Sequence, residues 1–319
     1  MSDLPLIRAD RAAPPAAPTT VATGGRGRRV RLLSRTDRVV IALMVLVPLL
    51  LVVGLVWLPA GATVLLSGTD WDGIGPLGDI EWVGGRNYTD VVGNYPPFVP
   101  AVQNNLLWLA ALFVVATPFG MFLAVLLDKE LRGSRFYQTA LYLPVVLSLA
   151  LIGFVWQLLY SRDQGLVNAV LGTDVDWYGD PDVNIWAVLV AAGWRHVGYI
   201  MLLYLAGLKG VDPSLREAAA VDGASEGRTF LKVIFPVLRP INVIVLVVTV
   251  IESLRAFDLV WVVNKGRNGL ELISALVTQN VVGEASRIGF GSALATLMLV
   301  VSLVFIAVYL ATVLREERR

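Results

Sequence analysis

Six long apolar runs dominate this sequence and restrict what it can fold into. Each run is about 20 residues long, the length that a helix needs to cross the ~30 Å hydrocarbon layer of a bilayer. The runs are continuous in Leu, Val, Ile and Ala and lack the period-two alternation of barrel strands. The sequence therefore predicts an all-α integral membrane protein with six transmembrane helices, over residues 39–58, 106–127, 140–160, 185–208, 241–263 and 288–314.

The composition agrees with a membrane protein and argues against several other classes. Of the 319 residues, 56% are hydrophobic and 16% are charged, and the mean hydropathy is +0.69. A net charge of +1 argues against a nucleic-acid partner, because phosphate recognition needs a surplus of basic side chains. The chain has no cysteine and one histidine, His196, so neither a thiolate site nor a multi-histidine metal site is expected.

The charges between the runs predict which helix ends face the cytoplasm. With the N-terminus inside, the cytoplasmic segments hold 19 of the 26 Lys and Arg residues, and the three outer loops hold five. Such an excess of basic residues is typical of cytoplasmic loops, so both termini are predicted to be cytoplasmic. Residues 1–37, rich in Pro, Ala, Gly and Arg, are expected to form a disordered tail, 38–314 the membrane domain, and 315–319 a short second tail.

One polar segment, residues 212–240, lies between the fourth and fifth runs and is called the insert below. Pro213 suits the first turn of a short helix, which either Asp212 or Ser214 is placed to cap. Gly223 permits the left-handed backbone that commonly ends a helix. The first half of the insert is therefore predicted to be a short helix followed by a turn.

The second half of the insert is expected to form another short helix. Ser225 is placed to cap that helix, and Pro236 and Pro240 are expected to stop it before the fifth run. The residues alone leave two interpretations open. The insert is either a compact helix–turn–helix that contacts a partner, or an amphipathic loop that stiffens the junction between two spans.

A motif inside the insert resembles that of a known family. The stretch "EAAAVDGASEGRTFLKVIFP" has the residue types and spacing of the EAA motif of permease subunits in ATP-binding-cassette importers. Val233 and Phe235 stand where isoleucine and leucine are usual, and both keep the apolar character. The residues that the resemblance assigns to ATPase coupling are Glu217, Ala218, Ala219, Asp222, Gly223 and Pro236.

Sequence on both sides of the motif is similar to the carbohydrate-permease group of the maltose and glycerol-phosphate type. "MLLYLAGLKGVDPSLREAAAVDGAS" looks like its signature stretch, and "LRAFDLVWVVNKG" is similar to the segment that ends its fifth core span. The resemblance runs over about residues 39–314. After Val263 the group usually has a glycine-rich turn with proline, whereas this chain has "NKGRNGLEL", so the sugar is left open.

This resemblance implies a fold, a mechanism and a set of partners. The fold is that of a type I ABC importer permease in a bacterial inner membrane, and the insert is a coupling helix seated on a cytoplasmic ABC ATPase dimer. That ATPase would bind ATP and Mg²⁺, because this chain lacks a G-x-x-x-x-G-K-[ST] motif and is expected to be non-catalytic. A second related permease would complete the pore, and an extracytoplasmic sugar-binding protein or lipoprotein would deliver the sugar.

Charged residues inside the runs are candidates for the substrate pathway. Arg195 lies in the fourth run, and Glu252, Arg255 and Asp258 follow at intervals of three in the fifth, so these three are expected on one helical face. Buried ionised groups in a bilayer cost roughly 3 kcal/mol or more and usually face a cavity or another charge. They either line a wet cavity that binds sugar hydroxyls, or form a structural ion-pair network with some groups reaching the interface.

Aromatic residues near these charges offer flat faces to a sugar ring. Those in the two charged runs are Trp194, Tyr199, Phe257 and Trp261. His196 is expected to hydrogen-bond to a neighbouring helix instead. Four others near the ends of runs are interpreted as interfacial anchors: Trp57, Trp108, Tyr160 and Trp186.

Two other functions compete with an ATP-driven permease. The main alternative is an ion-coupled secondary transporter of a small polar solute, which usually shows an internal repeat; no convincing repeat relates the first three runs to the last three. A membrane enzyme is disfavoured because no run carries paired carboxylates, an H-E-x-x-H motif or a nucleophile beside a base.

Overall fold

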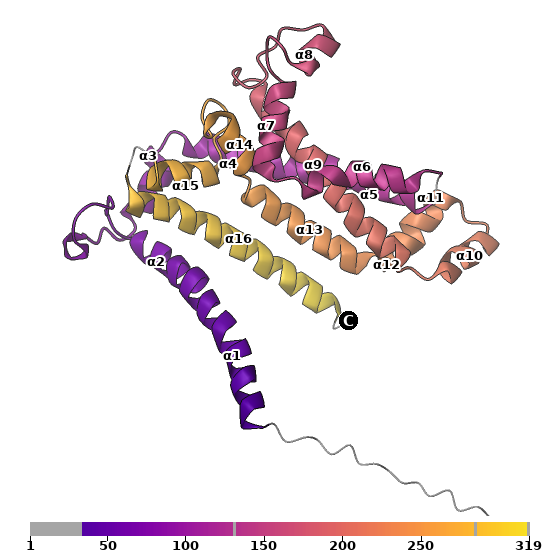
Figure 1. The fold of residues 1–319 in the computed structure, drawn as a ribbon, viewed down its shortest axis with the longest axis horizontal. Coiled ribbons are helices and arrows are strands. Elements are labelled where there is room, and N and C mark those ends of the chain that lie inside the picture. Colours follow the sequence, from indigo (N-terminus) through magenta and orange to yellow (C-terminus); the bar gives the residue numbers. More distant parts are fainter. Residues whose placement is uncertain (1–33, 130–131, 284–285, 318–319) are drawn as a thin grey trace, which may run out of the picture. The chain divides into compact units, whose positions relative to one another are not determined.

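The computed structural model describes residues 34–129, 132–283 and 286–317. These residues are helical apart from turns, loops and one isolated antiparallel bridge between Thr69 and Trp82, so the prediction of an all-α chain is confirmed for them (Figure 1). The chain divides into two compact units, residues 1–54 and 55–319. Most of the tail predicted over 1–37 lies outside the described residues.

The first unit contains helix α1, Arg35–Val52. Its start is fixed by a capping box, in which the Ser34 hydroxyl accepts a hydrogen bond from the Asp37 amide and the Asp37 carboxylate accepts one from the Ser34 amide. The helix therefore begins four residues before the predicted run. None of its side chains is buried, as expected for a helix surrounded by lipid.

Four helical runs of the described chain are long and apolar enough to cross a bilayer. They are Arg35–Leu66, Phe98–Asp128, Asn184–Lys209 and Ile288–Tyr309. Two bent helix pairs also qualify: Ser134–Val146 with Leu149–Leu159, bent by 105°, and Glu226–Val237 with Arg239–Asn264, bent by 76°. The number of spans is six when each bent pair is one span. The predicted third and fifth runs therefore each correspond to a bent helix pair.

The remaining bounds follow the chain order. After α2 (Leu58–Leu66) come η2 (Leu77–Asp79), α3 (Arg86–Asn94), α4 (Phe98–Ala110), α5 (Thr117–Asp128), α6 (Ser134–Val146), α7 (Leu149–Leu159), α8 (Leu166–Leu171) and α9 (Asn184–Lys209). The insert and the last spans supply α10 (Pro213–Val221), α11 (Glu226–Thr229), α12 (Phe235–Val237), α13 (Arg239–Leu254), α14 (Asp258–Asn264), α15 (Ile273–Val281) and α16 (Ile288–Glu317).

Three π-helical segments each lie just before a proline. They are η1 (Val53–Trp57), η3 (Ala111–Ala116) and η4 (Phe230–Ile234), and the prolines are Pro59, Pro118 and Pro236. A proline has no N–H to donate and disturbs a regular helical ladder. In a π turn the amide bonds five residues back, as the Thr117 amide does to the Leu112 carbonyl, and so the helix continues past the proline.

Helix α9 lies at the centre of unit 55–319, with α5 and α6 beside it (Figure 1). Of its most apolar stretch 56% is buried, against 28% for Phe98–Asp128 and for Ile288–Tyr309. Gly120 lets α5 approach closely, since a Cβ there would lie 2.8 Å from the Val197 carbonyl of α9. Helix α9 begins and ends within one residue of the predicted run 185–208.

Amide side chains bond the backbone groups that the helix breaks leave exposed. Asn105 on α4 donates to the Ser253 carbonyl at 3.1 Å and accepts from the Ile273 amide at 3.0 Å. Gln157 on α7 donates to the Val262 carbonyl at 3.2 Å. Because hydrocarbon offers no water as a partner, these bonds allow irregular backbone inside the bundle.

A buried polar cluster joins three helices. His196 on α9 contacts the Thr249 hydroxyl of α13 at 3.2 Å and the Thr117 hydroxyl of α5 at 3.5 Å. All three side chains are buried. The prediction that His196 bonds a neighbouring helix is confirmed.

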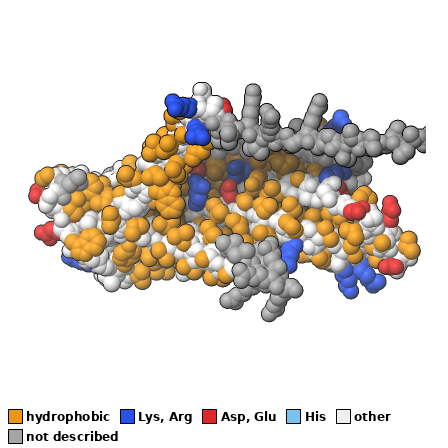
Figure 2. All heavy atoms as spheres, turned by 90° about the horizontal axis from the view of Figure 1, so that it is seen from below, with side chains coloured by type: hydrophobic (Ala, Val, Ile, Leu, Met, Phe, Trp, Pro, Cys, Tyr) orange, Lys and Arg blue, Asp and Glu red, His pale blue; other side chains and the backbone are white. Residues whose placement is uncertain are grey.

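The outer surface has the distribution expected in a membrane. Figure 2 shows hydrophobic side chains over most of the visible face, with charged side chains gathered mainly near its ends and a few in a shaded recess. Lipid can cover such a surface because it offers apolar contacts and no hydrogen bonds.

Candidate functional site

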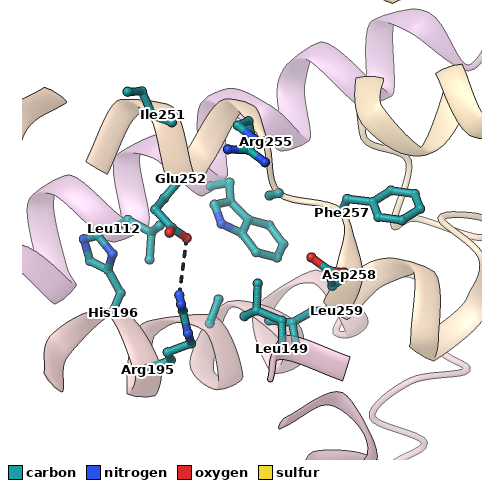
Figure 3. A pocket seen from close by; sticks show the side chains of 13 residues that line it. Leu112, Leu149, Arg195, His196, Ile251, Glu252, Arg255, Phe257, Asp258 and Leu259 are labelled. Carbon is teal, nitrogen blue, oxygen red and sulfur yellow. Dashed lines mark hydrogen bonds and ion pairs between the residues drawn. The ribbon is translucent and has the colours of Figure 1, made fainter. Parts of the chain in front are cut away.

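A small cavity lies where α9 and α13 meet the break between α13 and α14 (Figure 3). Its volume is about 150 Å³. Helix α4, η3 and α7 supply the remaining wall. The lining residues are Trp108, Leu112, Leu149, Ala192, Arg195, His196, Ile251, Glu252, Arg255, Ala256, Phe257, Asp258 and Leu259.

An ion pair crosses this cavity between two helices. The Arg195 guanidinium on α9 lies 3.4 Å from the Glu252 carboxylate on α13, and Figure 3 shows the two side chains pointing toward one another. The side chains are 22% and 38% exposed, and the buried Nε of Arg195 has no hydrogen-bond partner. The pair therefore lines a cavity and also links two helices.

The expected single face of three charges is wrong. Helix α13 ends at Leu254, residues 255–257 turn, and α14 begins at Asp258, so Glu252 and Asp258 belong to different helices. The break still directs Glu252, Arg255 and Asp258 into the lining of one cavity. The break is built into the fold because Asn105 and Ser274 bond the carbonyls of Ser253 and Ala256 at its two sides.

Aromatic residues take different places around the cavity. Phe257 lines it and stacks on Trp261, with ring centroids 5.1 Å apart. Trp194 lies outside the lining and packs edge-on against Trp156, and Tyr199 packs in the core near the insert. Of the aromatic residues predicted for sugar contact, Phe257 alone is part of the lining.

The first half of the insert is a capped helix that ends in a left-handed turn. The Asp212 carboxylate, rather than the Ser214 hydroxyl, caps α10 by accepting from the Ser214 amide at 2.9 Å. That backbone hydrogen bond holds the pKa of Asp212 below its ordinary value. At the other end Gly223 has φ +72°, its amide bonds the Ala220 carbonyl, and the Ala224 amide bonds the Ala219 carbonyl. This double closure is a Schellman motif, and the left-handed Gly223 that ends the helix agrees with the sequence prediction.

The residues of the motif do not all face the same way. Glu217, Ala218, Asp222 and Gly223 are exposed, whereas Ala219 is buried. No atom lies within 4 Å of where a Gly223 Cβ would stand, so the turn has open space in front of it. The exposed part of the insert is therefore a rigid surface able to receive a partner.

The second half of the insert differs from the prediction. Ser225 stands at the N-cap position of α11, but its side chain makes no capping hydrogen bond. Pro236 does not stop the helix, because η4 carries the backbone ladder past it and the helical run continues to Val237. Pro240 is instead the second residue of α13, in the first turn, where a missing amide hydrogen costs little.

The family model for "Binding-protein-dependent transport system inner membrane component" matches residues 116–318. This match covers more than half of the chain, including the insert and most of the cavity. The chain belongs to this family. It is therefore a multi-pass permease of the inner membrane, and the prediction from the motif is confirmed.

Named relatives agree with this assignment. The permease is 33% identical over 257 residues to the xylose/arabinose import permease protein XacH of Haloferax volcanii, covering 78% of this chain and 80% of that one. It is 31% identical over 309 residues to the diacetylchitobiose uptake system permease protein NgcF of Streptomyces coelicolor, covering 91% and 86%.

Solved structures share the fold of the permease. One is a bacterial ABC transporter involved in the import of the acidic polysaccharide alginate, with a TM-score of 0.75, 19% identity and coverage of 88% of this chain and 96% of that one. A second is that of a bacterial alginate transporter in complex with its oligosaccharide-bound periplasmic protein, with a TM-score of 0.74, 20% identity and coverage of 86% and 93%. The permease therefore has the fold of an ABC importer permease.

Sequence reasoning missed the roles of Trp108 in the cavity and of Asp128 beside the insert. Trp108 is 3% exposed and lines the cavity, so its interpretation as an interfacial anchor is wrong. Helix α4 begins at Phe98, eight residues before the predicted run, which places Trp108 deeper in the span. Tyr160 is also buried, against Trp156 and Trp177. Asp128 was also missed, because its partner on the insert, Arg216, lies 88 residues away in the sequence.

Proposed function

We propose that this permease forms half of the pore of an ATP-driven, binding-protein-dependent importer of sugars, and that the insert couples the pore to a cytoplasmic ATPase. One observation carries the proposal: the insert is a capped helix closed by a left-handed Gly223 turn, with Glu217, Asp222 and open space on its outer side. A capped helix–turn–helix transmits displacement as a rigid body, which a loose loop does not.

A sugar substrate is supported by the relatives and by the lining of the cavity. Relatives are named for xylose/arabinose, arabinooligosaccharides, diacetylchitobiose and trehalose/maltose. In this permease Arg195, Glu252, Arg255 and Asp258 offer charged hydrogen-bonding groups, and Phe257 offers a flat apolar face. Sugar hydroxyls both donate and accept hydrogen bonds, so such a mixture of groups suits them.

A second, related permease is supported by the size of the cavity. Ligand pockets usually measure roughly 300–1,000 Å³. The cavity in this chain measures about 150 Å³, so it is too small to enclose an oligosaccharide. We infer that its open side faces the second permease and that the two chains together enclose the substrate.

The other partners follow from the same assignment. An ABC ATPase dimer would bind ATP and Mg²⁺ and carry out hydrolysis, while this chain is non-catalytic. Among the described residues, no cluster of histidine or acidic side chains is able to hold a metal ion. An extracytoplasmic binding protein would deliver the sugar, as the neighbour structure with its oligosaccharide-bound periplasmic protein suggests by analogy.

In the proposed cycle, closure of the ATPase dimer displaces both inserts. Helices α9 and α13 carry the cavity residues Arg195 and Glu252 and lie directly before and after the insert in the chain. Movement of the insert would therefore shift both sides of the cavity and open it outward. The sugar released by the binding protein would enter there, and reopening of the ATPase would return the cavity to the cytoplasm.

The test replaces Gly223 in the complex purified with its native partners. Gly223→Val should abolish coupled uptake, since a β-branched residue is strained at φ +72°, whereas Gly223→Asn should retain much of it because asparagine tolerates this conformation. Uptake of radiolabelled xylose, arabinose, maltose, trehalose and diacetylchitobiose into proteoliposomes is measured with ATP present.

Two results would contradict the proposal. Normal ATP-driven uptake with Gly223→Val would remove the turn from the coupling mechanism. Uphill uptake by the chain alone, driven by a proton or sodium gradient without ATP, would establish the secondary transporter instead.

A further inference from the structure

The end of helix α5 is tied to the insert by a buried carboxylate. Asp128, the last residue of α5, lies 2.6 Å from the guanidinium of Arg216 on α10 and 3.5 Å from the ammonium of Lys209 at the end of α9. Its side chain is 7% exposed. One carboxylate thus joins the ends of two membrane helices to the first helix of the insert.

The neighbouring residue makes a contact of a different kind. Lys129 binds Glu226 on α11 at 2.6 Å, but those side chains are 49% and 86% exposed. Exposed ion pairs contribute little because water and salt screen them. A buried carboxylate depends strongly on its cations, and its removal would take away the carboxylate that Arg216 of α10 binds at the end of α5.

A hollow separates this part of the insert from the membrane helices. It measures about 630 Å³ and is lined by residues of α5, α9, α10 and α11, including Asp128 and Arg216. Beside this hollow, Leu215 of α10 packs against the core that α5 and α9 share. At this hollow the bond from Asp128 to Arg216 ties α10 to the end of α5, and the bond from Asp128 to Lys209 ties α5 to α9.

Helices α5 and α9 connect Asp128 to the cavity. Helices α5 and α9 share a close-packed core that includes Leu127 and Leu208, one residue away from Asp128 and Lys209. Helix α9 continues from there to Arg195 in the cavity. A displacement of α10 that is transmitted through Asp128 thus reaches a helix that carries a substrate-pathway residue.

We propose that Asp128 is a positioning residue for transport: it fixes the insert to α5 and α9 so that movement of the insert becomes movement of the cavity wall. This inference rests on the proposed coupling function of the insert. It assigns to α5 a role that the motif does not indicate, because Asp128 lies 88 residues before Arg216.

The first experiment measures the position of the insert without any partner. The chain has no cysteine, so Val221→Cys on α10 and Phe122→Cys on α5 are the only spin-label sites needed; these positions are 88% and 58% exposed. In nanodiscs, Asp128→Asn should broaden the distribution of label distances about twofold, while Lys129→Gln should leave its width unchanged. An unchanged width with Asp128→Asn would overturn the proposal.

The second experiment measures coupling in the complex with its native ATPase and binding protein. Asp128→Asn should lower sugar uptake per ATP hydrolysed on the order of fivefold at unchanged complex yield, Asp128→Glu should restore most of it, and Lys129→Gln should behave as wild type. A merely structural role would lower complex yield and leave the ratio unchanged, which would also overturn the proposal.

The proposed transport function and the proposed role of Asp128 can be refuted independently of each other. If the wild-type complex neither hydrolyses ATP nor takes up a sugar, the proposed function fails, while the label distances still report whether Asp128 holds the insert. If the wild type transports and Asp128→Asn keeps the same uptake per ATP, only the role of Asp128 is refuted.

Discussion

Single residues of this permease differ in how far sequence alone predicts their role. Gly223 and Asp212 act on neighbours within a few residues, so local rules predicted the glycine turn and narrowed the cap to Asp212 or Ser214. Asp128 and Trp108 act through partners distant in the sequence, so nothing local distinguishes them. Local chemistry is thus visible in a sequence, whereas a charge pair across the bundle needs the fold.

Arg195 is the residue of the cavity for which the sharpest prediction is possible. Arg195→Ala leaves Glu252 without its cation inside the membrane, and it removes a hydrogen-bond donor from the cavity wall. We expect uptake by the complex to fall about tenfold, equivalent to about 1.4 kcal/mol. Arg195→Lys should lose less because it keeps the charge.

The control for this prediction is assembly of the complex. The yield of ATPase that copurifies with Arg195→Ala should equal that of wild type, because the residue lies far along α9 from the insert. Unchanged sugar uptake with Arg195→Ala would remove this residue from the substrate pathway.

At the scale of elements, long unbroken helices were predictable and broken ones were not. Helix α9 is continuous, apolar and free of proline, so its bounds follow from the sequence. The break after Leu254 depends on Asn105 of α4 and Ser274, which bond carbonyls on a distant part of the chain. A hydropathy profile is averaged over a window much longer than this break, so the profile shows one continuous span.

Asn105 provides a test of this explanation. Asn105→Leu raises the hydropathy of α4 but leaves the Ser253 carbonyl and the Ile273 amide without partners, at a cost of about 1–3 kcal/mol for each group. We expect Tm of the purified permease in detergent to drop by several degrees. The matched control is Asn94→Leu, because Asn94 is exposed and bonds only the Asp90 side chain among the described contacts. Equal Tm values for the two variants would contradict this account of the break.

For the whole molecule, composition and spacing predicted an all-helical membrane protein, and its orientation remains a prediction. We expect the insert in the cytoplasm and the α7–α9 connection outside, following the distribution of basic residues. Two single-cysteine variants test this in a chain that has no other cysteine: Val221→Cys in the insert, 88% exposed, and Val170→Cys on α8, 73% exposed.

In intact cells, a membrane-impermeant maleimide should modify Val170→Cys and leave Val221→Cys unmodified until the membrane is opened. Labelling is read by a gel-mobility shift. The opposite pattern would place the insert outside, where no cytoplasmic ATPase reaches it, and would refute the coupling function as well as the orientation.

The π-helical turn η3 determines where the helix formed by α4, η3 and α5 can change in length. On one side Asn105 holds the break after α13, and on the other Thr117 meets His196 and Thr249. A π turn holds one residue more than an α turn, so removing one residue there would restore an ordinary α-helix and keep both sides facing as they do now. The same deletion in the regular part of α4 or α5 between these contacts would rotate everything beyond it by about 100° and turn one of the two sets of contacts toward lipid, so η3 is the place in this helix where a change in length can be accepted.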